Sequence, residues 1–226
     1  MKCIIPCAGQ GKRMGGNTPK VLLKVGASTI LEHVISTWTN VVDSYVVVVN
    51  PANAGQIRGQ LRRYENVEIV VQPAPAGLAD AIYQAKPYVR NRFIVSLGDC
   101  LFKGKFDEPC VDLGVGVWET RDLDEINKSY LVGVSPASGL IEDVIEKPNT
   151  TVPHGNCGMG TYFLNTSIFE YIRRAHLTDY SGGDFTLVLQ RMIHAGQKIS
   201  PIWFRGKYVN INTPSDIRKA EEVLHG

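Results

Sequence analysis

Several features that would mark a membrane protein, a secreted protein or a nucleic-acid-binding protein are missing from this 226-residue sequence. No apolar stretch approaches the ~18–20 residues that span a bilayer, so we expect no membrane helix and no membrane partner. The net charge is only +2 and the pI is near 8.2, which is too balanced to indicate nucleic acid as a partner. The chain opens directly on an expected strand in place of a signal peptide, so we expect a cytoplasmic location.

Cysteine is present, but in no pattern typical of a disulfide framework or a metal site. The five cysteines stand at positions 3, 7, 100, 110 and 157 and form no C-x-x-C pair. An odd number of cysteines without a signal peptide predicts reduced thiols. Cys7 precedes a glycine-rich segment and Cys100 follows Asp99, both of which are candidate site regions, so we expect either thiol to be sensitive to alkylation.

Two well-known phosphate-binding motifs are also absent from the glycine-rich segment. A Walker A loop needs Ser or Thr after Gly-Lys, but Gly11-Lys12 is followed by Arg13. The dinucleotide fingerprint needs a third glycine, and Met14 stands there unless Gly15 takes over the position. The next long strand also ends without an acidic residue, which argues against a nicotinamide-dependent oxidoreductase.

What the segment does contain is a short apolar strand followed by glycines and cations. Gly9 and Gly11 allow positive φ angles, so successive backbone N–H groups can converge on phosphate oxygens. Lys12, Arg13 and Lys20 add positive charge to the same loop. The combination predicts a triphosphate-binding loop, and the competing interpretation is a tight turn with solvated basic residues.

Strand-like and helix-like segments alternate after this loop. The apolar run at 45–49 is typical of a parallel strand that is covered on both faces. The alternation predicts an α/β fold with a Rossmann-like, doubly wound, mostly parallel mixed sheet and right-handed crossovers. The expected helices are 29–38, capped by Ser28, then 53–64, one opening near Leu78, 166–175, 184–195 and one ending near 224; the expected strands are 45–49, 67–71, 92–97, 113–119, 130–134, 140–147 and 198–204.

A carboxylate follows the expected strand 92–97, at Asp99. Open α/β sheets bind ligands at the carboxyl ends of their strands, which is where this side chain is expected. An aspartate there is a suitable oxygen ligand for Mg²⁺, which is commonly shared with substrate phosphates. The competing interpretation is a helix N-cap.

The stretch from Ala8 to Val25 closely resembles the G-x-G-x-R…P-K motif of the nucleotidyltransferases that act on sugar 1-phosphates and related small phosphates. Asp99 matches the aspartate of their G-D-[NAGC] motif. The resemblance implies catalytic roles for Arg13, Lys20 and Asp99. It also implies that the nucleotide is bound by Ala8, Gly9, Gln10, Gly11, Lys12 and Asp99.

A proline-rich turn before the helix near Leu78 is similar to the base-reading segment of the same family. Gln72 begins the turn and Gly77 ends it, and the family's G-[LT]-A-x-A segment follows. The resemblance implies that Gln72 and Gly77 bind the nucleotide, and a carboxamide suits a base edge because it both donates and accepts hydrogen bonds. An ordinary proline turn before a helix is the competing interpretation.

Later motifs of the family supply the expected acceptor and second metal residues. The E-K-P motif implies that Glu146 bonds sugar hydroxyls and Lys147 holds the sugar phosphate. In the strand that follows, the resemblance implies that Gly158 lets a sugar ring approach the backbone and that Asn156 can bond it. Asn210 stands where many members have a second metal-binding aspartate. Its carboxamide oxygen coordinates Mg²⁺ but neutralises less charge.

The resemblance therefore implies one catalytic domain over residues 1–226, with a nucleotide-binding half to about residue 110 and a sugar-phosphate-binding half after it. We expect Mg²⁺-dependent nucleotidyl transfer from a nucleoside triphosphate to a sugar 1-phosphate, by a monomer or homo-oligomer, without a covalent protein intermediate. Asn17-Thr18-Pro19-Lys20 is similar to the N-T-P-K of cytidylyltransferases for non-sugar phosphates such as phosphocholine, which stays an alternative. A non-catalytic protein that binds an NDP-sugar is a second alternative.

Overall fold

A computed structural model of the chain describes residues 1–9, 18–108, 110–176 and 185–225. Gln10, Gly11, Lys12 and Arg13, which the sequence places in the triphosphate loop, lie outside the described residues. The strands are β1 (Lys2–Pro6), β2 (Lys24–Val25), β3 (Ser28–Thr29), β4 (Ser44–Val49), β5 (Val67–Val71), β6 (Arg92–Ser96), β7 (Cys100–Phe106), β8 (Leu113–Thr120), β9 (Tyr130–Val134), β10 (Ile141–Glu146), β11 (Gly155–Asn165) and β12 (Ile199–Asn210). The helices are α1 (Ile30–Trp38), α2 (Ala54–Leu61), α3 (Gly77–Gln84), α4 (Leu123–Lys128), α5 (Ile168–His176), α6 (Phe185–His194) and α7 (Pro214–His225).

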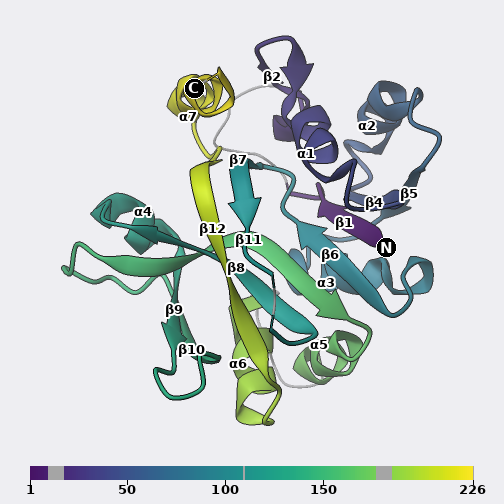
Figure 1. Cartoon of the computed structure of the whole chain (residues 1–226). Helices are drawn as coiled ribbons and strands as arrows, with labels where there is room; N and C mark the ends of the chain where they lie inside the picture. Colours follow the sequence, from purple (N-terminus) through teal and green to yellow (C-terminus); the bar gives the residue numbers. More distant parts are fainter. Residues whose placement is uncertain (10–17, 109, 177–184, 226) are drawn as a thin grey trace.

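A mixed sheet forms the centre of the fold, in the order β5-β4-β1-β6-β11-β8-β12-β7 (Figure 1). The first four strands pair in parallel, β11 is antiparallel to both β6 and β8, β12 is parallel to β8, and β7 is antiparallel to β12. Only β11 and β7 therefore oppose the other six strands of this order. The predicted mostly parallel mixed sheet is confirmed.

Helices cover both faces of the sheet because its strands are apolar on both sides. In β1, Ile4 faces a core shared with α3, α5 and α6, whereas Cys3 and Ile5 face a second core shared with α1, α2 and α7. All three side chains are fully buried. This two-sided burial explains why the strand is a continuous apolar run, and it confirms the doubly wound arrangement.

The start of α1 differs by one residue from the prediction. Thr29, and not Ser28, is the N-cap: its hydroxyl accepts the Glu32 N–H at 3.3 Å, and the Glu32 carboxylate accepts the Thr29 N–H at 2.8 Å. Ser28 pairs with Val25 in the small β2-β3 sheet instead. This reciprocal pair of hydrogen bonds, a capping box, satisfies two backbone donors at once, so it is more favourable than a single serine cap.

The antiparallel pair β7 and β12 positions the site, and the sequence patterns do not predict it. β7 is not expected from periodicity, and β12 extends to Asn210 in place of an expected end at 204. In their register Asn210 lies opposite Cys100, and the Ile211 N–H donates to the Asp99 carbonyl at 2.9 Å. Residues more than 100 positions apart are thereby held side by side.

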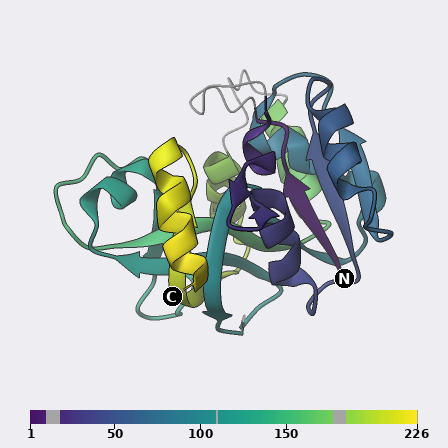
Figure 2. The ribbon, with the colours of Figure 1, turned by 90° about the horizontal axis from the view of Figure 1, so that it is seen from above.

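α7 follows directly and packs on β7, β12 and β2. In Figure 2 this yellow helix lies between the teal lobe that contains α4 and the purple N-terminal elements. Among the described residues, no helix combines the length and the apolar character that crossing a membrane requires.

Candidate active site

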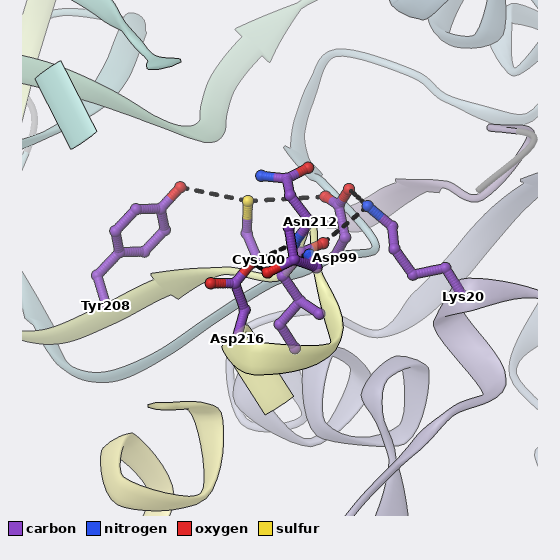
Figure 3. A network of polar contacts seen from close by, with 8 residues as sticks. Lys20, Asp99, Cys100, Tyr208, Asn212 and Asp216 are labelled. Atoms are coloured by element: carbon purple, nitrogen blue, oxygen red, sulfur yellow. Dashed lines mark hydrogen bonds and ion pairs between the residues drawn. The ribbon is translucent and has the colours of Figure 1, made fainter. Parts of the chain in front are cut away.

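Two predicted catalytic residues, Lys20 and Asp99, form an ion pair. The Lys20 Nζ donates to Asp99 Oδ2 at 2.5 Å and to the Ile211 carbonyl at 2.8 Å (Figure 3). Both side chains are largely shielded from solvent, with 17% and 25% of their surfaces exposed. Because an ammonium has three hydrogens, these contacts use two of them. The ion pair fixes the Asp99 carboxylate at the carboxyl end of the β6 strand, as the sequence predicts.

A thiol contacts Asp99 from the other side, and a phenol contacts that thiol. The Cys100 Sγ donates to Asp99 Oδ1 at 3.8 Å, and the Tyr208 hydroxyl lies 3.3 Å from the same sulfur (Figure 3). Burial, and then the nearby Asp99 charge, raises the pKa of Cys100 well above its usual value. Burial likewise raises the pKa of Tyr208, so both groups keep their hydrogens at neutral pH. The residues contribute polar contacts without adding charge.

The expectation that Cys7 and Cys100 are sensitive to alkylation is wrong. The two residues are only 4% and 1% exposed. Burial raises the pKa of both thiols far above neutrality, and the thiolate is the reactive form. Cys110, which has no place in the site, is exposed.

Asn210 has the burial and the unmet bonding expected of a ligand. Its Oδ1 atom is buried and has no hydrogen-bond partner among the described residues. A buried acceptor without a donor costs free energy, and a cation would satisfy it. The β7-β12 register places Asn210 beside Cys100, directly next to Asp99. A carboxylate and a carboxamide oxygen held together are a donor set that fits Mg²⁺.

A cleft of about 860 Å³ opens beside Asn210. It brings together four residues that the sequence assigns to the acceptor or metal site, namely Glu146, Lys147, Gly158 and Asn210. Asn156 is not among its lining residues. The lining also includes residues that the sequence does not single out, namely the aromatic Trp118, Tyr130, Tyr162, Phe185 and Tyr208, and the charged Glu125, Lys128, Asp216 and Lys219.

A separate cavity of about 110 Å³ is lined by Gly9, Lys20 and Asp99 among others. Two asparagines that sequence reasoning missed hold its wall. Asn50 Nδ2 donates to the Ala8 carbonyl at 2.9 Å, and Asn53 Nδ2 donates to the Cys7 carbonyl at 2.8 Å.

Each of these asparagines also accepts the backbone N–H of the other at 2.9 Å. The side chains of Asn50 and Asn53 thus close a turn at the end of β4 and fix the chain where β1 enters the glycine segment. The signal was available in the sequence as two Asn residues three apart after a buried strand, which is typical of a side-chain-bonded turn.

Gln72 is occupied within the protein and does not present its amide to a ligand. It is 3% exposed, and its Nε2 donates to Asp80 Oδ2 at 2.7 Å and to the Gly77 carbonyl at 3.1 Å. Both amide hydrogens are used in holding the proline turn against α3. In this structure Gln72 therefore supports the proline-rich turn, whereas Leu78, one residue after Gly77, reaches the cleft.

Lys147 has a strained backbone at the edge of the cleft. Its φ is 42°, in the left-handed region that non-glycine residues rarely adopt, and its N–H donates to the Ser129 carbonyl at 2.9 Å. The side chain is 71% exposed, and its Nζ lies 4.0 Å from the Glu146 carboxylate. A strained residue that turns an exposed ammonium toward a cleft is common at functional sites.

The structure shows a packing reason for glycine at position 158, which the sequence does not predict. A Cβ at this position would lie 1.8 Å from Cζ of Tyr130 and 2.2 Å from its hydroxyl oxygen. Tyr130 is itself only 6% exposed. The space on the Cβ side of Gly158 is filled by a tyrosine ring of the same chain, while Gly158 still lines the cleft, so its role toward a sugar stays a prediction.

Asp216 organises the segment between β12 and α7. Its Oδ2 accepts the N–H groups of Asn212 and Thr213 at 2.9 and 2.8 Å and the Thr213 hydroxyl at 2.9 Å. Partial burial acts to raise the pKa of Asp216, but these hydrogen bonds outweigh it and lower the pKa. The carboxylate therefore stays ionised and holds the wall of the cleft next to Asn210.

The comparison with known proteins identifies the family of this chain. A family model described as nucleotidyl transferase matches residues 2–225. The bifunctional protein GlmU of Methanocaldococcus jannaschii is 26% identical over 229 residues, which cover 99% of this chain and 54% of that protein. The chain thus spans about half the length of such curated relatives.

Two solved structures share the fold. The inositol-1-phosphate CTP transferase from T. maritima aligns with a TM-score of 0.81 at 21% identity, covering 100% of this chain and 96% of that one. A putative glucose-1-phosphate thymidylyltransferase from Bacillus anthracis aligns with a TM-score of 0.82 at 18% identity, covering 98% and 94%.

Proposed function

Because the chain belongs to the nucleotidyl transferase family, we propose that it transfers a nucleotidyl group from a nucleoside triphosphate to a sugar 1-phosphate, releasing pyrophosphate. The observation that carries the proposal is the Lys20–Asp99 ion pair, which lies between the small cavity beside Gly9 and the cleft beside Asn210. We divide the chain at about residue 110 into a nucleotide-binding half and an acceptor-binding half.

In the nucleotide half, the triphosphate binds at the small cavity. The remaining hydrogen of the Lys20 ammonium is available to a phosphate oxygen, and Arg13 adds a second cation from the glycine segment. Asp99 and Asn210 hold Mg²⁺, which supplies positive charge against the charge that builds on the phosphates. Lys20 and Arg13 act in the same sense because the transition state carries its charge on those oxygens.

In the acceptor half, the sugar 1-phosphate occupies the 860 Å³ cleft. Lys147 binds its phosphate and Glu146 accepts from hydroxyl groups. A phosphate oxygen attacks the α-phosphorus in line, an O–P bond forms, and the bond between that phosphorus and the pyrophosphate oxygen breaks. The attacking oxygen is already anionic, so no side chain has to remove a proton from it.

A non-sugar phosphate is a second candidate acceptor, favoured by the aromatic lining of the cleft. The rings of Trp118 and Tyr208 lie 5.2 Å apart in it, and the Glu125 carboxylate lines the same cleft. Aromatic faces and a carboxylate together attract a quaternary ammonium such as that of phosphocholine. No particular base is assigned to the nucleotide, so the assay varies the base.

The test is a pyrophosphate-release assay with Mg²⁺ that crosses five nucleoside triphosphates with sugar 1-phosphates and phosphocholine. We expect release with one pair, and a loss of about 10²–10³-fold in turnover for Lys20→Ala and Asp99→Ala. Asp107→Ala, which breaks the exposed pair with Arg205, is the control that retains turnover. Ligand-induced thermal stabilisation without release from any pair would contradict the proposal and favour a non-catalytic NDP-sugar-binding protein.

A further inference from the structure

The Asp99 carboxylate is held through both of its oxygens. Lys20 takes Oδ2, and the Cys100 thiol donates to Oδ1. The thiol lies in turn 3.3 Å from the Tyr208 hydroxyl. Asp99 and Cys100 are neighbours in sequence, whereas Tyr208 comes from the antiparallel strand β12, so the contact depends on the register of the sheet.

The hydrogens that these groups carry fix the direction of both hydrogen bonds. A thiol carries a single hydrogen, and donation to Asp99 Oδ1 uses it. The Tyr208 hydroxyl must then be the donor in its contact with the sulfur. The result is a chain in which Tyr208 donates to Cys100 and Cys100 donates to Asp99.

The sulfur has little freedom to move. Gly160 has φ +69°, and a Cβ there would lie 3.2 Å from the Cys100 sulfur and 2.6 Å from a methyl carbon of Leu97. Cys100 is 1% exposed. Close packing on this side leaves the thiol directed toward the carboxylate, so the contact is part of the core and not of a solvated surface.

The Tyr208 end of this hydrogen-bond chain lies at the cleft. Tyr208 lines the cleft, and its ring packs against that of Trp118, which also lines it. Asn210, two residues further along β12, lies on the same face of the strand as Tyr208. The chain of contacts therefore connects the acceptor cleft with the carboxylate next to the nucleotide cavity.

We propose that Cys100 and Tyr208 are positioning residues that orient the Asp99 carboxylate toward its cation. The inference rests on the metal-binding role proposed for Asp99. If the thiol and hydroxyl only fill space, then Cys100→Ala and Tyr208→Phe, which keep nearly the same apolar shape, leave Asp99 where it is. If the thiol and hydroxyl orient Asp99, then Cys100→Ala and Tyr208→Phe each change the direction of Asp99 Oδ1. Cys100→Ser, which keeps a hydrogen-bond donor at this position, leaves that direction unchanged.

The first readout is the crystal structure of wild type and of these three variants, in which the Asp99 torsion angles are compared. The second is Mn²⁺ binding to the same proteins followed by electron paramagnetic resonance, with Mn²⁺ alone as the probe. We expect the Mn²⁺ dissociation constant to rise about tenfold in Cys100→Ala and Tyr208→Phe, because residues that hold a metal ligand typically contribute about 10–100-fold to affinity. Cys100→Ser should stay within about threefold of wild type.

Two variants control for the loss of a buried thiol and of a buried hydroxyl elsewhere. Cys157→Ala removes a fully buried thiol from β11, and Tyr45→Phe removes a hydroxyl that donates to the Ile35 carbonyl at 2.8 Å. Both should leave the Asp99 torsion angles and the Mn²⁺ affinity unchanged, even where they lower stability.

An unmoved Asp99 in Cys100→Ala and Tyr208→Phe, or unchanged Mn²⁺ affinity in both, overturns the inference. Absence of Mn²⁺ binding in wild type overturns it together with the metal role of Asp99. A reoriented Asp99 with weakened Mn²⁺ binding supports it, even if wild type turns over none of the substrate pairs, in which case only the proposed reaction fails. Conversely, turnover in wild type with an unmoved Asp99 leaves the proposed reaction standing and refutes the positioning role.

Discussion

Replacing Gly158 with alanine should destabilise the protein, because the new methyl group has no room. Its carbon would lie 1.8 Å from Tyr130 Cζ and 2.2 Å from both Cε2 and the hydroxyl oxygen. The ring cannot swing away freely, since Tyr130 is 6% exposed and belongs to β9, which pairs with β10 and β11. Either the tyrosine or the backbone of β11 has to move.

Overpacking of this kind typically costs about 1–3 kcal/mol, and the very short contacts at Gly158 place it at the upper end. A loss of about 3 kcal/mol corresponds to a fall of roughly 6–12 °C in Tm for a chain of this size. Urea unfolding followed by circular dichroism gives the free energy directly.

A double-mutant cycle isolates the cause. Tyr130→Ala alone should cost about 3–5 kcal/mol, as for other large aromatic truncations. In that background Gly158→Ala should cost less than about 0.5 kcal/mol, because the atoms that it would strike are gone. Tyr130→Phe should give no rescue, since its ring carbons remain in the same place.

Unchanged stability of Gly158→Ala would refute this reasoning. If the variant kept its stability but bound the acceptor more weakly, the original prediction, that Gly158 lets a sugar approach the strand, would be favoured over the packing role. Equal costs of Gly158→Ala in the wild-type and Tyr130→Ala backgrounds would also contradict the packing role.

Three further predictions follow from individual side chains. Lys147→Gly and Lys147→Ala should both weaken acceptor binding in steady-state kinetics, but the glycine variant should be about 1 kcal/mol more stable in urea, because the left-handed φ of 42° strains alanine and not glycine. One thiol should react rapidly with DTNB in the native protein and five in denaturant, because only Cys110 is exposed. Burial raises the pKa of Cys157 to about 11 and those of Cys3, Cys7 and Cys100 still further, so these four thiols should react slowly. Cys110→Ser should abolish the rapid phase. The folded-state pKa of Asp216 lies below its ordinary value of 3.8, so the ionised carboxylate stabilises the fold above that pH, and this stabilisation is lost as the pH falls through the folded-state pKa. Asp216→Asn should therefore be less stable than wild type at pH 6, and the difference in unfolding free energy should close below about pH 4. A difference that is constant with pH would contradict the assignment.

Much of the first half of the chain can be predicted from the sequence because its signals are local. The runs at 45–49 and 67–71 are each apolar over a few residues, and the observed strands Ser44–Val49 and Val67–Val71 agree with them to within one residue. The family resemblance implies catalytic roles for both Lys20 and Asp99, and the two are in contact. Short-range periodicity and turn chemistry are sufficient where a strand carries its apolar residues close together in the sequence.

The elements around the large cleft are harder to predict. α4 contributes Glu125 and Lys128 to the cleft, but it is short and polar and has no strong helical period. β7 begins directly after Asp99 with three buried residues, and the exposed Lys103, Gly104 and Lys105 that follow interrupt the apolar run before Phe106. Such elements form because they pair with or pack against distant parts of the chain, and that information is not contained in a short window.

The sequence by itself determined the fold class, the family and the residue types available for the chemistry, because these depend on motifs and periodicities that span a few positions. Only the tertiary structure decided which of those residues face a ligand. It turned the Gln72 amide inward to Asp80, covered Gly158 with Tyr130, and left the Asn210 oxygen buried and unpaired among the described residues. Each of these outcomes depends on long-range packing and on the β7-β12 register, which together determine whether a polar atom meets a protein partner or is left for a ligand.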